Sequence, residues 1–403
     1  MSKIIWDKET GGVKLTPFVT KETLGVSPRP VFYEELDLLK LKDLGWQYPK
    51  SQDPLLWACN KLYFYRGKLA FEAKGANIYD EPTVIFQQGF ERMNLVPVNM
   101  KAMLEKCNDE MFLLESEAIE FIREQYVQYS SARKSVEEIK ANQLDYEALA
   151  TKVEKQTKQK MAIVKQDCDS FDIIPLESAK KDGKKTYQTT RIDKFLASFS
   201  GGKDSQVILD LCARAIPPSA FEVIYSDTGY ELPTSLTLYE EVKDFYRKKF
   251  PELKFSTARN HETVLNYWDK IGTPSDTHRW CCSVMKTAPL YRLLKEIHGT
   301  GKQPNVLVFE GVRAEESNRR ALYDRIGRGV KHNNVVNARP IFDWSATEIY
   351  LYLFMRRLPI NQGYRNGLWR VGCSICPYSS DWSEHIVAKK YPDSINPFIS
   401  PHY

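Results

Sequence analysis

The chain has 403 residues, 42% of them hydrophobic, so it is long enough for two or three domains with cores of their own. Its formal charge of +5 suits anionic ligands such as nucleotides and only weakly favours a nucleic-acid partner. No stretch approaches the roughly 18 apolar residues of a membrane span, and the polar start of the chain lacks the apolar core of a secretory signal. We therefore expect a cytoplasmic protein and exclude a membrane protein and a small disulfide-stapled fold.

Residues 1–97 are rich in aromatic and β-branched residues, with Pro and Gly between them. Apolar and polar residues nearly alternate on both sides of Arg66 and Gly67, which predicts a β-hairpin over 61–72. We therefore predict a small β-rich accessory domain over 1–97. Interleaved Lys, Arg and Tyr residues allow a role in nucleic-acid or partner recognition, and a purely structural appendage explains them equally well.

Residues 98–177 are predicted to form a helical connector. The stretch 98–174 contains neither Pro nor Gly, and 118–127 and 146–153 space their apolar residues helically. The next stretch, 178–191, has few apolar residues, many lysines and an Asp-Gly pair, which indicates a solvated linker. A basic loop that contacts phosphates is the alternative interpretation of this stretch.

From residue 191 onward, predicted strands and helices alternate in the manner of an α/β, doubly wound, mostly parallel sheet. We expect strands over 195–199, 221–225, 253–258 and 306–310, and helices over 205–215, 236–249, 287–298 and 346–357. The whole of 178–403 is assigned to this domain. Ligands of such sheets lie beyond the carboxyl ends of the strands, and every motif below follows a predicted strand.

The chain is organised around Ser-Gly-Gly-Lys-Asp-Ser at 200–205, between a predicted buried strand and a predicted helix. The two glycines permit backbone angles and a close approach that Cβ atoms would block, so amide N–H groups and the helix dipole can point at an anion. The spacing of a Walker A motif is missing. We predict an exposed phosphate-binding loop, and an ordinary strand-to-helix turn is the alternative.

Two further segments follow predicted strands. Asp227, Thr228 and Gly229 stand at the tip of the second strand and are, by themselves, only a turn signal. Arg313 follows the fourth strand, where a guanidinium can fork onto phosphate or sulfate oxygens. We predict Arg313 as an anion contact. A capped, solvent-facing helix start is the alternative interpretation of its Glu- and Arg-rich surroundings.

The chain contains eight cysteines, and four of them form two close pairs: Cys281 with Cys282, and Cys373 with Cys376. Four thiolates match the ligand count of a tetrahedral zinc site or of a 4Fe-4S cluster. Adjacent cysteines suit zinc poorly, because zinc sites usually separate paired ligands by two or more residues, so we favour the cluster, with zinc as the alternative. No obvious reactive setting surrounds the other cysteines, which are Cys59, Cys107, Cys168 and Cys212.

Residues 191–385 resemble the phosphoadenosine phosphosulfate (PAPS) reductase family. Ser-Gly-Gly-Lys-Asp-Ser matches the PP-loop of the N-type ATP pyrophosphatases, which implies an adenine nucleotide alpha hydrolase-like fold. The family's Asp-Thr-Gly, Gly-x-Arg-x-x-Glu-Ser and Pro-Ile-x-x-Trp segments match 227–229, 311–317 and 340–344. Tandem cysteines, a distant Cys-x-x-Cys and a lysine four positions after the second cysteine match its cluster-bearing members.

The resemblance implies roles for individual residues. It implies a 4Fe-4S cluster, with zinc as the alternative, on Cys281, Cys282, Cys373 and Cys376. It implies ATP, with Mg²⁺, as the nucleotide. The implied catalytic residues are Lys203, Asp204, Lys286 and Arg313. The implied nucleotide-binding residues are Ser200, Gly201, Gly202, Lys203, Asp204, Ser205, Asp227, Thr228, Gly229 and Arg313.

Assimilatory reductases of the family end in a tail whose cysteine attacks the sulfate, and no cysteine follows Cys376 here. The chain therefore looks more like the family's nucleic-acid sulfur-transfer members, such as the DNA phosphorothioation proteins of the Dnd and Ssp type. This resemblance implies an ATP pyrophosphatase that adenylylates an acceptor oxygen of a nucleic acid, with a cysteine desulfurase as the sulfur donor. A PAPS or adenosine phosphosulfate (APS) reductase and a non-catalytic nucleotide- or redox-sensing subunit are the alternatives.

Overall fold

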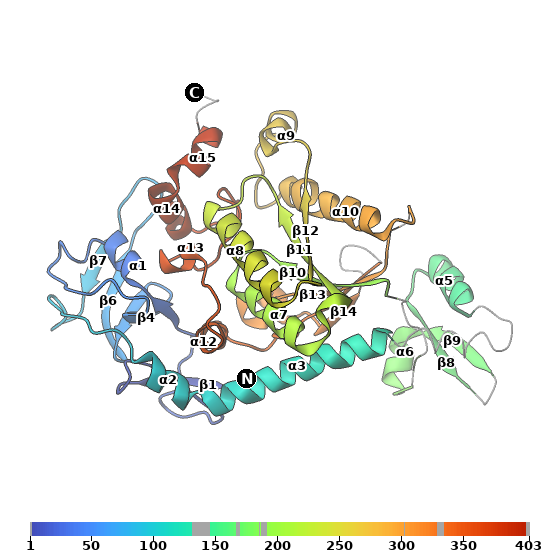
Figure 1. Cartoon of the computed structure of the whole chain (residues 1–403), viewed down its shortest axis with the longest axis horizontal. Helices are drawn as coiled ribbons and strands as arrows, with labels where there is room; N and C mark the ends of the chain where they lie inside the picture. The colour runs from blue at the N-terminus through green and yellow to red at the C-terminus, as the bar shows by residue number, and fades with distance from the viewer. Residues whose placement is uncertain are drawn as a thin grey trace.

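The computed structural model of the chain describes residues 2–130, 146–166, 170–184, 186, 192–301, 303–328 and 334–399. Cys168 and residues 187–191 therefore lie outside the described residues. A central α/β domain stands between a β-rich N-terminal domain and a small hairpin module, and one long helix runs along all three (Figure 1). Among the described residues, no helix is long and apolar enough to span a bilayer.

The central sheet has six strands, and all of its neighbouring pairs except the last are parallel. In spatial order the strands are β12 (Lys254–Arg259), β11 (Phe221–Asp227), β10 (Lys194–Phe199), β13 (Val306–Phe309), β15 (Val335–Ala338) and β14 (Ile326–Arg328). The chain moves outward from β10 in one direction to β11 and β12, and then returns to the other side of β10 for β13. This order is that of a doubly wound sheet, as predicted.

Alternation along β10 sends side chains to both faces of the sheet, and helices cover each face. Phe195, Ala197 and Phe199 pack with α7 and α8, whereas Leu196 packs with α10. The domain's helices are α7 (Lys203–Ala215), α8 (Pro233–Lys249), α9 (Val264–Ile271), α10 (Ala288–His298), α11 (Asn318–Ala321), α12 (Ala346–Met355), α13 (Gln362–Arg365), α14 (Asp381–Lys390) and α15 (Pro392–Ile399).

The four predicted strands and four predicted helices of this domain are confirmed to within a few residues at their ends. Their ends carry local signals: α12 begins with a capping box between Ser345 and Glu348, and α10 ends at Gly299 in the left-handed region. The edge strand β14 and its neighbour β15 were not predicted. A π-helical turn, η3 (Cys282–Thr287), precedes α10, and short 3₁₀ turns occupy η2 (Pro218–Ala220) and η4 (Ala314–Glu316).

The N-terminal domain contains a five-stranded antiparallel sheet, and its hairpin turns at Arg66 and Gly67 as predicted. Its side chains form one core with residues after position 360, including Tyr364, Leu368 and Trp382. The elements of this domain are β1 (Lys3–Asp7), β2 (Gly12–Thr16), β3 (Arg29–Val31), α1 (Tyr33–Leu38), β4 (Leu56–Cys59), β5 (Leu62–Tyr65), β6 (Lys68–Lys74) and β7 (Thr83–Phe86).

The connector contains α2 (Met100–Lys106), α3 (Asn108–Ser130) and α5 (Tyr146–Thr157), and α3 packs lengthwise on α7. It is not helical throughout, because β8 (Met161–Lys165) and β9 (Phe171–Pro175) pair as an antiparallel hairpin before α6 (Leu176–Lys181). Ile163 and Val164 of β8 are β-branched, pair with β9 and are buried, which explains why this stretch forms a strand. The hairpin module buries a small core of its own with α5.

Candidate functional site

The loop 200–205 leaves the carboxyl end of β10 at the point where the chain order of the sheet reverses. The next two strands in the chain, β11 and β12, lie on one side of β10, and β13 lies on the other. A crevice at such a reversal is where doubly wound sheets bind ligands. Gly202 begins α7 without a side-chain cap, so the start of this helix offers amide N–H groups and a positive dipole end to an anion.

The loop is packed more tightly than the predicted exposed loop. Gly201 adopts a φ of +72°, and a Cβ atom there would lie 2.8 Å from the Cβ of Ser235 on α8. Gly201, Gly202 and Lys203 are buried, and Ser200 is exposed. Glycine is therefore required at position 201 by both the backbone angle and the space, and the open side of the loop is the side of Ser200.

Two serine hydroxyls close the loop. The Ser200 amide donates to Ser205 Oγ over 3.1 Å, and the Ser200 hydroxyl lies 3.2 Å from the same oxygen. Ser205 in turn donates to the carbonyl oxygen of Gly202 over 2.8 Å. The loop thus holds its own curvature before any ligand arrives, which lowers the ordering cost of binding.

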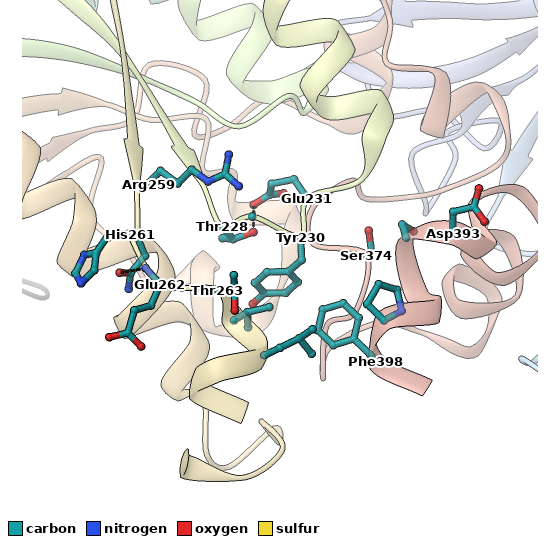
Figure 2. Close-up of a pocket in the computed structure, with 16 residues that line it drawn as sticks. Thr228, Tyr230, Glu231, Arg259, His261, Glu262, Thr263, Ser374, Asp393 and Phe398 are labelled. Carbon is teal, nitrogen blue, oxygen red and sulfur yellow. Dashed lines mark hydrogen bonds between the residues drawn. The ribbon is translucent and has the colours of Figure 1, made fainter. Parts of the chain in front are cut away.

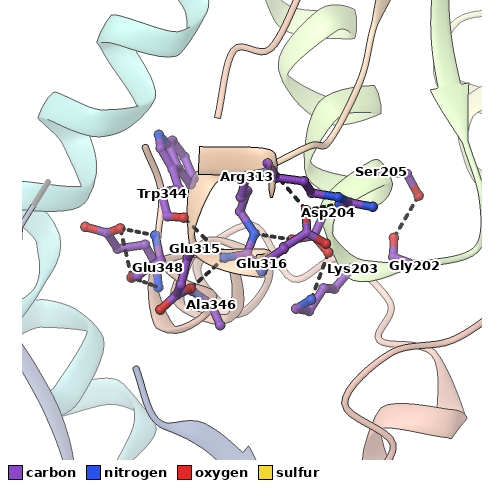
Figure 3. A network of polar contacts seen from close by, with 12 residues as sticks. Gly202, Lys203, Asp204, Ser205, Arg313, Glu315, Glu316, Trp344, Ala346 and Glu348 are labelled. Carbon is purple, nitrogen blue, oxygen red and sulfur yellow. Dashed lines mark hydrogen bonds and ion pairs between the residues drawn. The ribbon is translucent and has the colours of Figure 1, made fainter. Parts of the chain in front are cut away.

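Asp204 lies at the centre of an ion-pair network (Figure 3). Lys203 Nζ is 2.8 Å from Asp204 Oδ2, and Arg313 Nε donates to Asp204 Oδ1 over 2.6 Å. Burial raises the pKa of Asp204, but the charges of Lys203 and Arg313 outweigh it and lower this pKa to about 2. Asp204 is therefore an ionised acceptor whose two oxygens both face cations of the protein.

Arg313, predicted as an anion contact, is placed beneath the loop. Its side chain is 4% exposed and also donates to Glu315 over 2.7 Å and to the Trp344 carbonyl over 3.2 Å. Gly311 lets this segment come close, because a Cβ there would lie 2.8 Å from the backbone carbonyl carbon of Asp204. In this arrangement Arg313 fixes Asp204 and the loop backbone.

The tip of β11 turns through the three predicted residues. The amide of Gly229 donates to Asp227 Oδ1 over 2.7 Å, and Arg259 lies 3.3 Å from Asp227 Oδ2. Thr228 is fully buried and donates to Glu231 over 3.1 Å. The carboxylate of Asp227 therefore shapes the turn, and the turn brings Glu231 beside the second cysteine pair.

The two cysteine pairs come from distant segments that meet at this turn. Cys373 forms a β-bridge with Glu231, and its thiol donates to the Glu231 carboxylate over 3.7 Å. Cys281 lies at the start of η3, close enough to Cys373 for their charges to interact. Cys376 follows Cys373 and interacts with it electrostatically. All four thiols therefore lie at the edge of the sheet that carries the loop.

Positive side chains accompany these thiols. Hydrogen bonding to Cys281, with help from Arg279 at 3.4 Å, lowers the pKa of the Cys282 thiol below its ordinary value. Lys286 Nζ lies 3.1 Å from Glu231, one turn along η3 from the tandem cysteines. Burial lowers the pKa of Lys286, but the Glu231 carboxylate outweighs it and raises this pKa above its ordinary value. The predicted catalytic lysine thus stands between the two cysteine pairs.

The types of side chain at this point fit a metal group, but the distances between them do not. Four thiols, a thiolate-stabilising arginine and a lysine provide the softness and charge that zinc or an iron–sulfur cluster requires. Within the described ranges, however, no group of three or more Cys, His, Asp or Glu side chains is arranged closely enough to hold a metal ion. Binding would therefore require the pairs to draw together.

A cavity of about 390 Å³ adjoins the thiols, between α9 and α15 (Figure 2). Tyr230 and Phe398 line it from the β11 turn and from α15, with their ring centroids 5.9 Å apart. Arg259 and Asn260 contribute polar groups at the end of β12, and Ser374 connects the cavity to Cys373. An aromatic wall beside cationic and amide groups suits a planar, polar ligand.

Sequence reasoning missed the residues that support the loop from behind. Asn361 Nδ2 donates to the Gly201 carbonyl over 2.9 Å, and the Lys203 amide donates to Tyr364 Oη over 3.1 Å. Both lie beside or within α13, some 160 residues further along the chain. No periodicity or spacing links them to the loop, so only the fold reveals this contact.

The fold and the loop define a doubly wound α/β domain whose loop, at the carboxyl end of β10, suits an anion. Residues 194–379, a little under half of the chain, match the family described as the phosphoadenosine phosphosulfate reductase domain. This match confirms the resemblance on which the sequence prediction rests.

Known relatives share this region. A protein of Methanocaldococcus jannaschii, called uncharacterized, is 32% identical over 212 residues, which are 52% of this chain and 41% of that protein. The phosphoadenosine 5'-phosphosulfate reductase of Gloeobacter violaceus is 26% identical over 45% of this chain and 70% of its own. This chain spans less than half the length of the first relative and of a second from the same archaeon.

Among solved structures, the phosphoadenylyl-sulfate reductase of Candida auris in its phosphate complex overlaps 45% of this chain and 81% of its own. The overlap has 19% sequence identity and a TM-score of 0.35. A likeness of this size carries no argument about function.

Proposed function

We propose that the protein is a PP-loop ATP pyrophosphatase that activates an acceptor oxygen for replacement by sulfur, with a nucleic acid as the acceptor. The observation that carries this proposal is the placement of two cysteine pairs beside an anion-binding loop at one edge of the sheet. The loop suits a nucleotide's phosphates and the thiols suit sulfur chemistry, so the two halves of the reaction share one site.

ATP enters as its Mg²⁺ complex, with its β- and γ-phosphates on the open side of the loop at Ser200. The amides at the start of α7 stabilise the charge that develops on the leaving pyrophosphate. Both oxygens of Asp204 face Lys203 and Arg313, so this carboxylate is not free to hold Mg²⁺. Mg²⁺ would arrive with ATP and would offset the charge of the leaving pyrophosphate. Arg313 keeps the loop in register during the reaction.

The acceptor oxygen attacks the α-phosphorus of ATP and pyrophosphate leaves, which gives an adenylylated acceptor. A thiol reductant releases sulfide from the persulfide of a cysteine desulfurase partner, and the thiol is oxidised to a disulfide in this step. The sulfide then attacks the activated atom, forms the new bond to sulfur and expels AMP. The cavity beside Tyr230 and Phe398 is where the acceptor's planar portion fits. Lys286 stands where it can meet the negative charge of the incoming sulfur.

The four paired cysteines fit a 4Fe-4S cluster in ligand number and type, with zinc as the alternative. Cys281 and Cys282 would hold it from η3, and Cys373 and Cys376 from the loop before α14. When bound, an iron–sulfur cluster supplies a site that can bind and deliver sulfur. Arg279 and Lys286 would offset the negative charge of the thiolate ligands.

The remaining cysteines favour sulfur transfer over reduction of a sulfonucleotide. A reductase needs a thiolate that can attack the sulfate sulfur. Burial raises the pKa of Cys59 and of Cys107 to about 11, and burial also raises that of Cys212. Among the described cysteines outside the two pairs, none is therefore prepared to act as this nucleophile.

Anaerobic incubation with MgATP, APS and PAPS in separate reactions tests the proposal. We expect ATP to yield AMP and pyrophosphate in the presence of an acceptor nucleic acid and sulfide, with no sulfite from APS or PAPS in the presence of a thiol reductant. Sulfite from either sulfonucleotide would instead support a reductase, the activity named for the Gloeobacter violaceus relative. ATP binding without turnover under all of these conditions would support a sensing subunit.

A further inference from the structure

The N-terminal domain reaches the phosphate-binding loop through α13 and its preceding residue. On one side, Asn361 donates to the Gly201 carbonyl over 2.9 Å and to Ser235 Oγ over 3.3 Å. Tyr364 accepts from the Lys203 amide over 3.1 Å, and its ring lies 5.3 Å from Lys203 Nζ. The two side chains therefore hold the loop at its left-handed glycine and at the first residue of α7.

The opposite side of α13 is held by the N-terminal domain. Arg365 Nε donates to Glu34 Oε1 over 2.7 Å, and its other nitrogens donate to the Ser51 and Gln52 carbonyls. Gln362 donates to the same Glu34 carboxylate over 3.3 Å. The Arg365 guanidinium also lies 4.2 Å from the centre of the Phe32 ring. Both side chains of the Arg365–Glu34 pair are about nine-tenths buried.

The residues just after α13 also pack closely against the N-terminal domain. A Cβ atom at Gly367 would lie 2.7 Å from the carboxyl carbon of Glu35, and Gly367 itself has a φ of +98°. Glu35 is in turn fixed by a buried pair with Arg29 and by the Tyr63 hydroxyl. The chain around α13 therefore cannot shift without disturbing the buried charges of the N-terminal domain.

We propose that the N-terminal domain positions the PP-loop through α13, with Tyr364 and Asn361 as positioning residues for nucleotide binding. The inference rests on the proposed nucleotide site, and it adds that the N-terminal domain controls the affinity of this site. The serine hydrogen bonds within the loop hold neither the left-handed glycine nor the first amide of α7, so these two points depend on outside contacts for their geometry. Without these contacts the loop is less ordered before binding. Ordering it then costs part of the binding free energy, so the affinity for the nucleotide falls.

The first test removes only the tyrosine hydroxyl. Tyr364→Phe should raise the Kd for inorganic pyrophosphate, measured by calorimetry, about five- to tenfold, the effect of roughly one hydrogen bond. It should also speed hydrogen exchange of the loop amides at 200–205. The matched control is Tyr246→Phe, which removes another buried hydroxyl bound to α7, at Asp210, and should leave both readouts unchanged.

The second test acts from the N-terminal domain, far from the ligand. Glu34→Gln keeps the size of the side chain but removes its charge, and should raise the same Kd about threefold and speed the same loop exchange. Its control is Glu117→Gln, which breaks a bidentate but more exposed pair between α3 and Arg325. Unchanged loop exchange in both Tyr364→Phe and Glu34→Gln would overturn the positioning role. Wild-type protein that binds neither pyrophosphate nor ATP would overturn the nucleotide site instead, while the exchange data still decide the positioning role.

Discussion

At the scale of single residues, the site depends on charges that face the protein rather than the solvent. Asp204 sits between Lys203 and Arg313, and its pKa is held at about 2. The sequence shows that Lys203, Asp204 and Arg313 each follow a predicted strand, but it does not show that their side chains pair with one another. Because these three side chains, which look like ligand contacts in the sequence, pair with one another, they support the loop.

This support predicts a pH-dependent stability. The folded pKa of Asp204, about 2, is below its ordinary value of 3.8, so its ionisation stabilises the fold above about pH 4 and this contribution is lost as the pH falls toward 2. Asp204→Asn leaves the buried Lys203 ammonium without its carboxylate partner and removes one of the ion pairs of Arg313, and it should cost about 3 kcal/mol at pH 7. Urea unfolding of both proteins at pH 7, 5 and 3 measures this difference.

The control for this prediction is Asp43→Asn, an exposed aspartate that should change the free energy of unfolding by less than about 0.5 kcal/mol. The gap between wild type and Asp204→Asn should stay constant from pH 7 to pH 5 and narrow by pH 3. A gap that is absent at pH 7, or one that widens in acid, would show that the carboxylate is not stabilised by these cations.

At the scale of helices and strands, the sequence predicted those elements that local patterns of apolar and turn residues define. Apolar strand patterns and the turn motifs that follow them located β10, β11, β12 and β13, and the motif order placed each functional segment at the same edge of the sheet. The short α13 was not predictable, because four residues carry no helical periodicity and its contacts with the loop are tertiary. The strand β14 was missed because its three residues pair only through the returning β15.

The cysteine pairs allow a prediction at this scale, because they bring η3 and the loop after α13 to one point. Protein purified without oxygen should contain about four irons and four sulfides per chain and show a broad visible absorption. Cys373→Ser should remove most of this iron, and Cys212→Ser, which changes a buried cysteine on α7, should not. Stoichiometric zinc without iron would instead assign the site to zinc.

At the scale of the whole molecule, the sequence predicted a β-rich N-terminal domain but did not reveal which later residues complete its core. Its composition changes near residue 97, whereas its core is completed by side chains after position 360. Trp382, Leu368 and Tyr364 pack against strands that precede them by some 300 residues. A local sequence pattern does not predict such a contact, because apolar residues give the same pattern whichever surface they pack against.

This shared core predicts that the N-terminal and central domains unfold together. Leu36→Ala, in the N-terminal part of the shared core, should lower one common transition and cost about 2–5 kcal/mol, because it leaves a cavity at a fully buried site. Scanning calorimetry should show this transition shifting as a whole. Ile163→Ala in the hairpin module, which has a separate small core, is the control and should leave the main transition in place. Two separable main transitions, with only one moved by Leu36→Ala, would mean that the N-terminal domain folds by itself and that α13 cannot transmit its position to the loop.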